Sequence, residues 1–191
     1  ADEHMRQVVD AIVNKSYGRL GFHNGVGNTY NAILTTSSIE QAQRYYDMFK
    51  AVKEGTAPVK IGERIKRILP DFPKVAITYS VTENEEDSTL NQDKMKASLD
   101  DYNQEFGTQF AMDQLHAYNR NVNDRLARKK ERYQQRHEQL DLVIVVDRLL
   151  TGFDAPCMST LFIDRKPMRE HNLIQAFSRT NRLFNKAKKY G

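Results

Sequence analysis

The segment Leu140–Val146, with the sequence LDLVIVV, restricts the fold of this chain more than any other part. It is an almost continuous run of apolar, mostly β-branched residues with the length of one strand. Strands that read in this way are buried on both faces, as in parallel sheets that helices cover from two sides. The run therefore predicts an α/β fold.

The remaining elements alternate around this strand in the order expected of such a fold. Other segments with strand character are 30–36 (YNAILTT), 74–80 (KVAITYS) and 160–164 (TLFID). Apolar residues at helical spacing predict helices over 3–15, 39–53, 61–69 and about 170–184. Strand–helix units of this kind make an open, mostly parallel sheet with helices on both faces.

The start of the second helix carries a doubled capping signal. Ser37 and Ser38 follow the first strand, and Glu40 and Gln41 stand three residues beyond each of them. A serine followed at this distance by Glu or Gln is typical of a helix N-terminus. The helix is therefore expected to begin directly after the strand.

A helical hairpin is predicted between the second and third strands, at about 91–137. Its two apolar stripes are Met95, Leu99, Tyr102 and Phe106, and then Met112, Leu115, Tyr118, Val122 and Leu126. The part from Asn119 to Arg136 has seven Lys or Arg and two acids, a net of 7 − 2 = +5. Such a stretch is usually a solvated helix face, and nucleic-acid phosphates are the alternative partner.

Composition is compatible with one domain, residues 1–191, that includes the hairpin. Of the residues, 39% are hydrophobic, and the net charge of +4 with a pI near 9.1 permits an acidic partner. Cys157 is the single cysteine, which excludes an internal disulfide and fits a reducing compartment. The histidines show no metal-ligand spacing, so no metal site is predicted, and neither a membrane span nor a signal peptide is expected.

Candidate ligand-binding residues follow the strands, because open α/β sheets bind ligands at the carboxyl ends of their strands. Thr36 and Ser37, at the end of the first strand, offer hydroxyls and amides to a phosphate, although taken alone they are better explained as an ordinary helix cap. Thr151, Gly152 and Asp154 lie in LTGFDAP after the third strand. A plain turn is the alternative for that segment.

The last predicted helix carries QAFSRTNR, residues 175–182. Arg179 and Arg182 are three residues apart and therefore lie on one helix face, and Gln175 precedes Arg179 by one turn. A basic helix is often only a solvated face, but an apolar stripe here gives the arginine side a defined direction. Two guanidinium groups on one face can bind a polyphosphate from outside.

The sequence G-x-x-x-x-G-K-[ST] does not occur anywhere in the chain. A Walker A loop, whose backbone amides surround the phosphates of a nucleotide, is therefore not encoded. The chain therefore has arginines that can contact the phosphates of a nucleotide bound by another domain, but it has no Walker A loop to hold the triphosphate itself.

Taken together, these segments resemble the second RecA-like domain of superfamily-two helicases, and within it the motor (R) subunit of type I restriction enzymes. The likeness is strongest over 140–184, where LLTGFDAP resembles motif V and LIQAFSRTNR resembles motif VI. YNAILTTSS is similar to motif IV, and DYNQEFGTQF lies in the inserted hairpin. The resemblance implies a RecA-like fold.

Site roles follow from the resemblance, residue by residue. It implies that Arg179 and Arg182 face ATP across a cleft, with Gln175 supporting them, and that Asp154 couples nucleotide to DNA. It implies DNA-backbone contacts for Thr36, Ser37, Thr151 and Gly152. ATP and Mg²⁺ would be held mainly by a first motor domain, which this chain does not contain.

The resemblance implies that the chain is a fragment of an ATP-dependent DNA translocase and endonuclease in the cytoplasm of a bacterium or archaeon. Expected partners are double-stranded DNA, the first motor domain, and the modification and specificity subunits. Alone, the fragment is expected to be inactive, because it lacks Walker A and a nuclease domain. The alternatives are another superfamily-two motor, or a non-catalytic DNA-binding or docking module that uses a basic surface of Arg125, Arg128, Lys129, Lys130 and Arg132.

Overall fold

The structure, a computed structural model, describes residues 2–79, 88–146 and 157–164. Within these ranges four strands form one sheet in the order β2-β3-β1-β4, and every neighbouring pair runs parallel. The strands are β1 (Asn31–Thr36), β2 (Val75–Thr78), β3 (Leu142–Val146) and β4 (Met158–Asp164). The predicted α/β fold with an open parallel sheet is confirmed.

Strand β3 lies between β2 and β1, in the interior of the sheet. Its residues from Leu142 to Val145 are at most 2% exposed, as expected for a strand that is covered on both faces. One apolar row crosses the sheet, because Ile144 is in register with both Ile77 of β2 and Leu34 of β1, and Leu34 is in register with Phe162 of β4. This row is the centre of the hydrophobic core.

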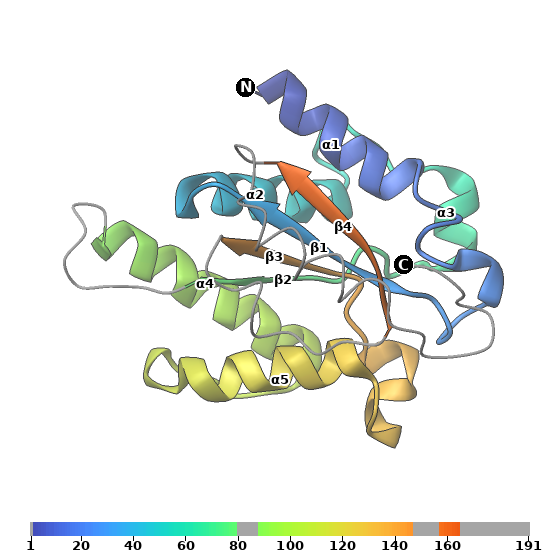
Figure 1. The fold of residues 1–191 in the computed structure, drawn as a ribbon. Helices are drawn as coiled ribbons and strands as arrows, with labels where there is room; N and C mark the ends of the chain where they lie inside the picture. Colours follow the sequence, from blue (N-terminus) through green and yellow to red (C-terminus); the bar gives the residue numbers. More distant parts are fainter. Residues whose placement is uncertain (1, 80–87, 147–156, 165–191) are drawn as a thin grey trace, which may run out of the picture.

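Helices lie on both sides of the sheet (Figure 1): α1 and α2 are on one side, and α4 and α5 are on the other. The α-helices of the described residues are α1 (Asp2–Asn14), α2 (Ile39–Glu54), α3 (Glu63–Ile68), α4 (Ser88–Phe106) and α5 (Leu115–Ala127). Short 3-10 helices are η1 (Phe22–Asn24), η2 (Met112–Gln114), η3 (Glu131–Gln134) and η4 (Arg136–Glu138). Helix α2 contacts β1, β2 and β3, and it ends at Gly55, whose left-handed φ of 79° suits glycine.

The helices α4 and α5 form the predicted hairpin between β2 and β3. Its turn is held by Asn103, which donates to the carbonyl of Phe110 at 2.9 Å and accepts from the Thr108 hydroxyl at 2.8 Å. The buried hydroxyl of Tyr118 donates to the carbonyl of Ile77 in β2 at 2.7 Å. Because of this bond and its apolar stripes, the hairpin packs into the core as part of the domain.

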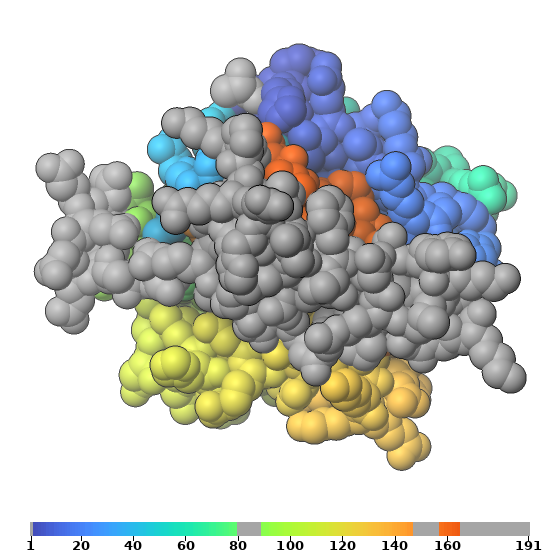
Figure 2. Space-filling model, in the orientation of Figure 1, coloured from blue at the N-terminus to red at the C-terminus, as the bar shows by residue number. Residues whose placement is uncertain are grey.

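Figure 2 shows the face on which β4 reaches the surface, beside α1. Ile163 of β4 is 44% exposed, consistent with the position of β4 at the edge of the described sheet. None of the described helices combines the length and the apolar character that crossing a membrane requires.

Candidate functional site at the carboxyl edge of the sheet

The carboxyl ends of β1 and β4 lie side by side at one edge of the parallel sheet. Thr36, the last residue of β1, is in register with Asp164, the last residue of β4. Ser37 and Ser38 continue the chain from β1 into α2. This edge is where open α/β sheets bind ligands.

Thr36 is fully buried, and its hydroxyl donates to the carbonyl of Val145 in β3 at 3.0 Å. The side chain therefore stabilises the end of β1 against the neighbouring strand. Ser37 is exposed, in contrast, and is the more accessible of the two DNA contacts predicted at the end of β1. Neither DNA contact is tested by the structure, and both stay predictions.

The predicted helix cap is present at Ser38. Its hydroxyl accepts from the Gln41 amide at 3.1 Å, and its backbone has the extended conformation of an N-cap. The side chain of Gln41 does not complete the box at Ser38. Instead its carbonyl oxygen accepts from both the backbone N–H and the hydroxyl of Ser37, each at 2.8 Å.

Asp164 is the hub of a polar cluster at this edge, and it joins three elements. Its Oδ2 accepts from the Gln41 side-chain amide at 3.0 Å and from the Tyr45 hydroxyl, both on α2. Its Oδ1 lies 2.9 Å from Nε2 of His4 on α1. The Asp164 side chain is 15% exposed, so the carboxylate is shielded but remains within reach of solvent.

Tyr45 is fully buried beneath this carboxylate. Burial raises the pKa of the Tyr45 hydroxyl far above its ordinary value, and the hydrogen bond to Asp164 and the charge of that carboxylate raise it further. The hydroxyl therefore stays protonated at any physiological pH and acts as a permanent donor to Asp164.

The other residues predicted for the site lie outside the described residues: Thr151, Gly152, Asp154, Gln175, Arg179 and Arg182. Sequence reasoning missed Asp164, Tyr45 and His4 as members of the edge cluster. Asp164 could have been identified from the sequence, because it ends the predicted strand TLFID just as Thr36 ends the first predicted strand.

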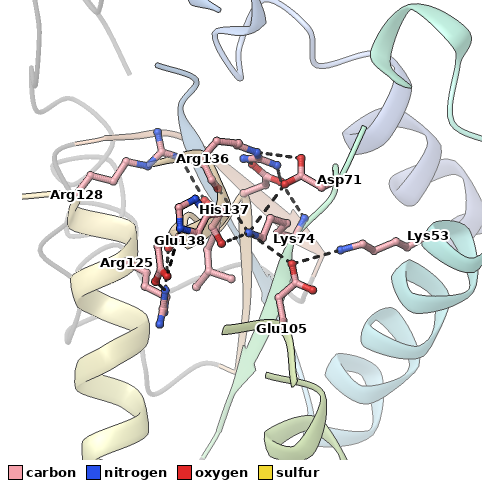
Figure 3. Close-up of polar contacts among 11 residues, drawn as sticks. Lys53, Asp71, Lys74, Glu105, Arg125, Arg128, Arg136, His137 and Glu138 are labelled. Atoms are coloured by element: carbon pink, nitrogen blue, oxygen red, sulfur yellow. Dashed lines mark hydrogen bonds and ion pairs between the residues drawn. The ribbon is translucent and has the colours of Figure 1, made fainter. Parts of the chain in front are cut away.

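The opposite, amino edge of the sheet holds a dense ionic network (Figure 3), which joins residues of α4, α5 and η4 to the starts of β2 and β3. Arg136 donates to the two carboxylate oxygens of Asp141 at 2.6 and 2.8 Å and to Asp71 at 3.0 Å. Lys74, just before β2, donates to the carbonyl of His137 at 2.6 Å and lies 3.4 Å from Glu105.

The pKa values of Asp141 and Lys74 are both lowered, but for different reasons. Burial alone would raise the pKa of Asp141, but the charge of Arg136 and its two hydrogen bonds outweigh burial and lower it. Burial is the main cause that lowers the pKa of Lys74, and Glu105 opposes the shift. The shielded charges of this network, on Lys74, Arg136 and Asp141, therefore depend on their partners being present.

The proposed basic surface for DNA is wrong for two of its five residues. Arg125 is 0% exposed, donates to Glu138 at 2.6 Å and lies over the ring of Phe106. Arg128 is also buried and donates to the carbonyls of Thr29 and Leu140. Charge alone places both arginines on the exposed basic surface, but the fold buries Arg125 on the inner side of α5 and Arg128 at the C-cap of that helix.

Two of the three exposed members of that set have acidic neighbours. Lys130 lies 3.0 Å from Asp124, and Arg132 lies 3.2 Å from Glu138. Because local carboxylates already compensate these cations, the segment is a weaker attractor of phosphates than its +5 charge suggested. The DNA-binding or docking module therefore keeps three of its five proposed residues at the surface, Lys129, Lys130 and Arg132.

A cavity of about 420 Å³ lies between α2, α4 and the start of β2. Its polar lining includes Lys50, Lys53 and Lys74 together with Asp101 and Glu105. Lys50 is paired with Asp101 at 3.1 Å, and Lys74 is paired with Glu105. Because Lys74 and Val75 line it, the cavity lies at the amino end of β2, away from the candidate site.

The parallel sheet and the helices on its two faces define an α/β domain, and the polar cluster at the carboxyl edge of the sheet marks the candidate site. A family model described as type I restriction enzyme subunit R domain 3 (T1R_D3-like) matches residues 28–191. The chain belongs to this family.

Curated relatives agree with this assignment. The type I restriction enzyme SauMRSORF196P endonuclease subunit of Staphylococcus aureus (strain MRSA252) is 29% identical over 198 aligned residues, covering 100% of this chain. The SsaAORF53P endonuclease subunit of Staphylococcus saprophyticus is 33% identical over 163 residues, 85% of this chain and 16% of the relative. The HindI endonuclease subunit of Haemophilus influenzae is 46% identical over 79 residues, 41% of this chain and 7% of the relative.

The chain spans only 18% of the length of the first of these relatives. It therefore corresponds to one part of a type I restriction endonuclease subunit.

Proposed function

We propose that this chain is the second RecA-like motor domain of a type I restriction R subunit, and that it helps ATP hydrolysis to move duplex DNA past the complex before cleavage. Membership of the R-subunit family supports the proposal, as does the resemblance of LLTGFDAP and LIQAFSRTNR to helicase motifs V and VI. Membership of the same family weighs against another superfamily-two motor.

The observation that carries the proposal is the layout of the carboxyl edge. Ser37 follows β1 directly, and Asp164 ends the adjacent strand β4. In sequence, the motif V segment follows β3 and the motif VI segment follows β4. Each candidate segment thus continues from the carboxyl end of one of three neighbouring strands, as expected of a single site.

In this proposal ATP is the substrate and, with Mg²⁺, is held mainly by the first motor domain of the same subunit. Within the described residues no group of three or more His, Cys, Asp or Glu side chains could hold a metal ion. Arg179 and Arg182 contact the phosphates from this side, Gln175 supports them, and Asp154 couples them to the DNA.

DNA contacts in this proposal come from Thr36, Ser37, Thr151 and Gly152. The buried hydroxyl of Thr36 also fixes the end of β1 and thereby places Ser37. ATP would bridge the two motor domains and close them, and hydrolysis would release them. The modification and specificity subunits complete the assembly.

The test is ATP turnover by the complete R subunit, assembled with its partner subunits and duplex DNA. Arg179→Ala and Arg182→Ala should each lower turnover by about 10³–10⁵, the usual effect of losing such an arginine. Lys66→Ala, at an exposed position of α3, is the control and should leave turnover unchanged. Near-normal turnover in both arginine variants would remove the proposed role.

A further inference from the structure

The side chain of Gln41 connects the ends of two strands at the carboxyl edge. Its carbonyl oxygen accepts from the N–H and the hydroxyl of Ser37, each at 2.8 Å. Its NH₂ group donates to Oδ2 of Asp164 at 3.0 Å. One amide therefore spans from the residue that follows β1 to the last residue of β4.

Only an amide can make this connection in both directions. The side chain must accept at its Ser37 end and donate at its Asp164 end, and Gln carries both functions on one planar group. A carboxylate at position 41 would still accept from Ser37, but it would place a second negative charge against Asp164. An alanine would make neither contact.

The contact with Ser37 occupies the same donors that a phosphate would need. A phosphate oxygen that accepts from the Ser37 N–H and hydroxyl has to replace the carbonyl oxygen of Gln41. Gln41 would then lose two of its hydrogen bonds and its fixed orientation toward Asp164. Binding of a phosphate at Ser37 would therefore weaken the hydrogen bond between Gln41 of α2 and Asp164 at the end of β4.

Asp164 is the point from which the chain continues toward the predicted ATP-contacting arginines. Arg179 follows it by only 15 positions. The Asp164 carboxylate also contacts Tyr45 and His4 of α1, so these two contacts remain when the hydrogen bond from Gln41 is lost. Because two of its three contacts remain, Asp164 is expected to shift slightly at the end of β4 and to stay bound to α1 and α2.

We propose that Gln41 is a positioning residue that transmits the binding of a DNA phosphate at Ser37 to the end of β4, and so to the ATP-contacting segment. This inference rests on the proposed function. It adds a residue outside the helicase motifs. Because a phosphate and Gln41 compete for the same donors on Ser37, loss of Gln41 should weaken the stimulation of ATP turnover by DNA without weakening DNA binding.

The experiment measures ATP turnover of the complete R subunit against duplex DNA concentration, and it compares Gln41→Ala with Gln41→Glu. Gln41→Ala frees the Ser37 donors, so the DNA concentration for half-maximal stimulation should not rise. The maximal stimulation by DNA should nevertheless fall about 5-fold or more, the size of a typical coupling between sites. Gln41→Glu should lose stimulation similarly and also bind DNA more weakly.

Gln43→Ala is the matched control on the same helix. Gln43 is buried and donates to the Tyr79 hydroxyl at 2.6 Å, so its loss removes a buried hydrogen bond without touching the edge cluster. Thermal unfolding of all three variants checks that they are folded. The control should keep the wild-type ratio of DNA-stimulated to unstimulated turnover.

Two results would overturn the inference: wild-type stimulation in both Gln41 variants, or an equal loss of stimulation in Gln43→Ala. The proposed function fails separately, if the wild-type subunit shows no DNA-stimulated turnover or if Arg179→Ala and Arg182→Ala both leave turnover intact.

Discussion

Replacing Arg125 tests whether this residue of α5 belongs to the interior. Its guanidinium group donates to Glu138 at 2.6 Å, to the Tyr102 hydroxyl at 2.9 Å and to Asn121 at 2.9 Å, and its side chain is 0% exposed. Arg125→Ala would remove all of these bonds and leave the Glu138 carboxylate, which is only 13% exposed, with one partner fewer.

Breaking a buried ion pair by removing one partner costs about 3–5 kcal/mol. The lower end of that range is expected here, because Arg132 still pairs with Glu138 at 3.2 Å. A loss of about 3 kcal/mol in a domain of this size lowers the melting temperature by roughly 6–12 °C.

Arg132→Ala is the matched control, because Arg132 pairs with the same carboxylate oxygen of Glu138 from the surface, with its side chain 60% exposed. Exposed ion pairs contribute about 0–1 kcal/mol. Urea unfolding of the purified chain at pH 7 gives both values from the transition midpoints. Equal losses in the two variants, within about 0.5 kcal/mol, would refute the assignment of Arg125 to the interior.

Three further predictions concern the tie between the hairpin and the sheet, acid stability and the isolated chain. Tyr118→Phe should lower the free energy of unfolding by about 1–2 kcal/mol in the same urea assay, because the Ile77 carbonyl loses its buried donor; an unchanged midpoint would contradict this. Because the pKa of Asp141 is lowered in the folded protein, its contribution to the free energy of unfolding is complete above about pH 4 and is lost as the pH falls further. Asp141→Asn should therefore be less stable than wild type at pH 7, and the difference in free energy of unfolding should be smaller at pH 3. A difference that does not change with pH would contradict this prediction. The purified chain with Mg²⁺, ATP and duplex DNA should show no turnover, because it lacks a Walker A loop, and turnover abolished by a substitution within the chain would contradict this.

Local rules predicted the elements of this fold well. The apolar run of β3 required cover on both faces, and the structure places β3 between two other strands with helices on both sides. The serine pair before α2 predicted its start, and Ser38 is the N-cap. These predictions succeeded because each depends on residues close together in sequence.

The place of Arg125 could have been read from helix geometry, since it is three residues after Val122 and seven after Tyr118, both on the buried stripe. The residue that accepts its shortest hydrogen bond, Glu138, could not be read from the sequence in this way. Glu138 lies beyond the helix in η4, and only the folded chain returns it to α5. Charge counting along a segment therefore overestimated its exposed positive charge.

The candidate site was predictable in position and not in detail. Parallel strands fix the edge at which Ser37 and Asp164 meet, and that edge follows from the fold class. The bond between Gln41 and Asp164 joins residues 123 positions apart, and no local pattern distinguishes it from the helix cap that Gln41 also suggested. The cluster of His4 and Tyr45 around the same carboxylate depends on packing in the same way.

The rate at which the complete R-subunit assembly moves along duplex DNA tests the central claim most directly, when Ser37→Asp is compared with Lys130→Asp. The first change places a carboxylate at the carboxyl edge, where a DNA phosphate is proposed to bind. The second reverses an exposed charge in the basic stretch at the end of α5. Translocation should stop in Ser37→Asp and continue at the wild-type rate in Lys130→Asp; the reverse pattern would contradict a motor site at this edge and favour the basic segment as the DNA-binding surface.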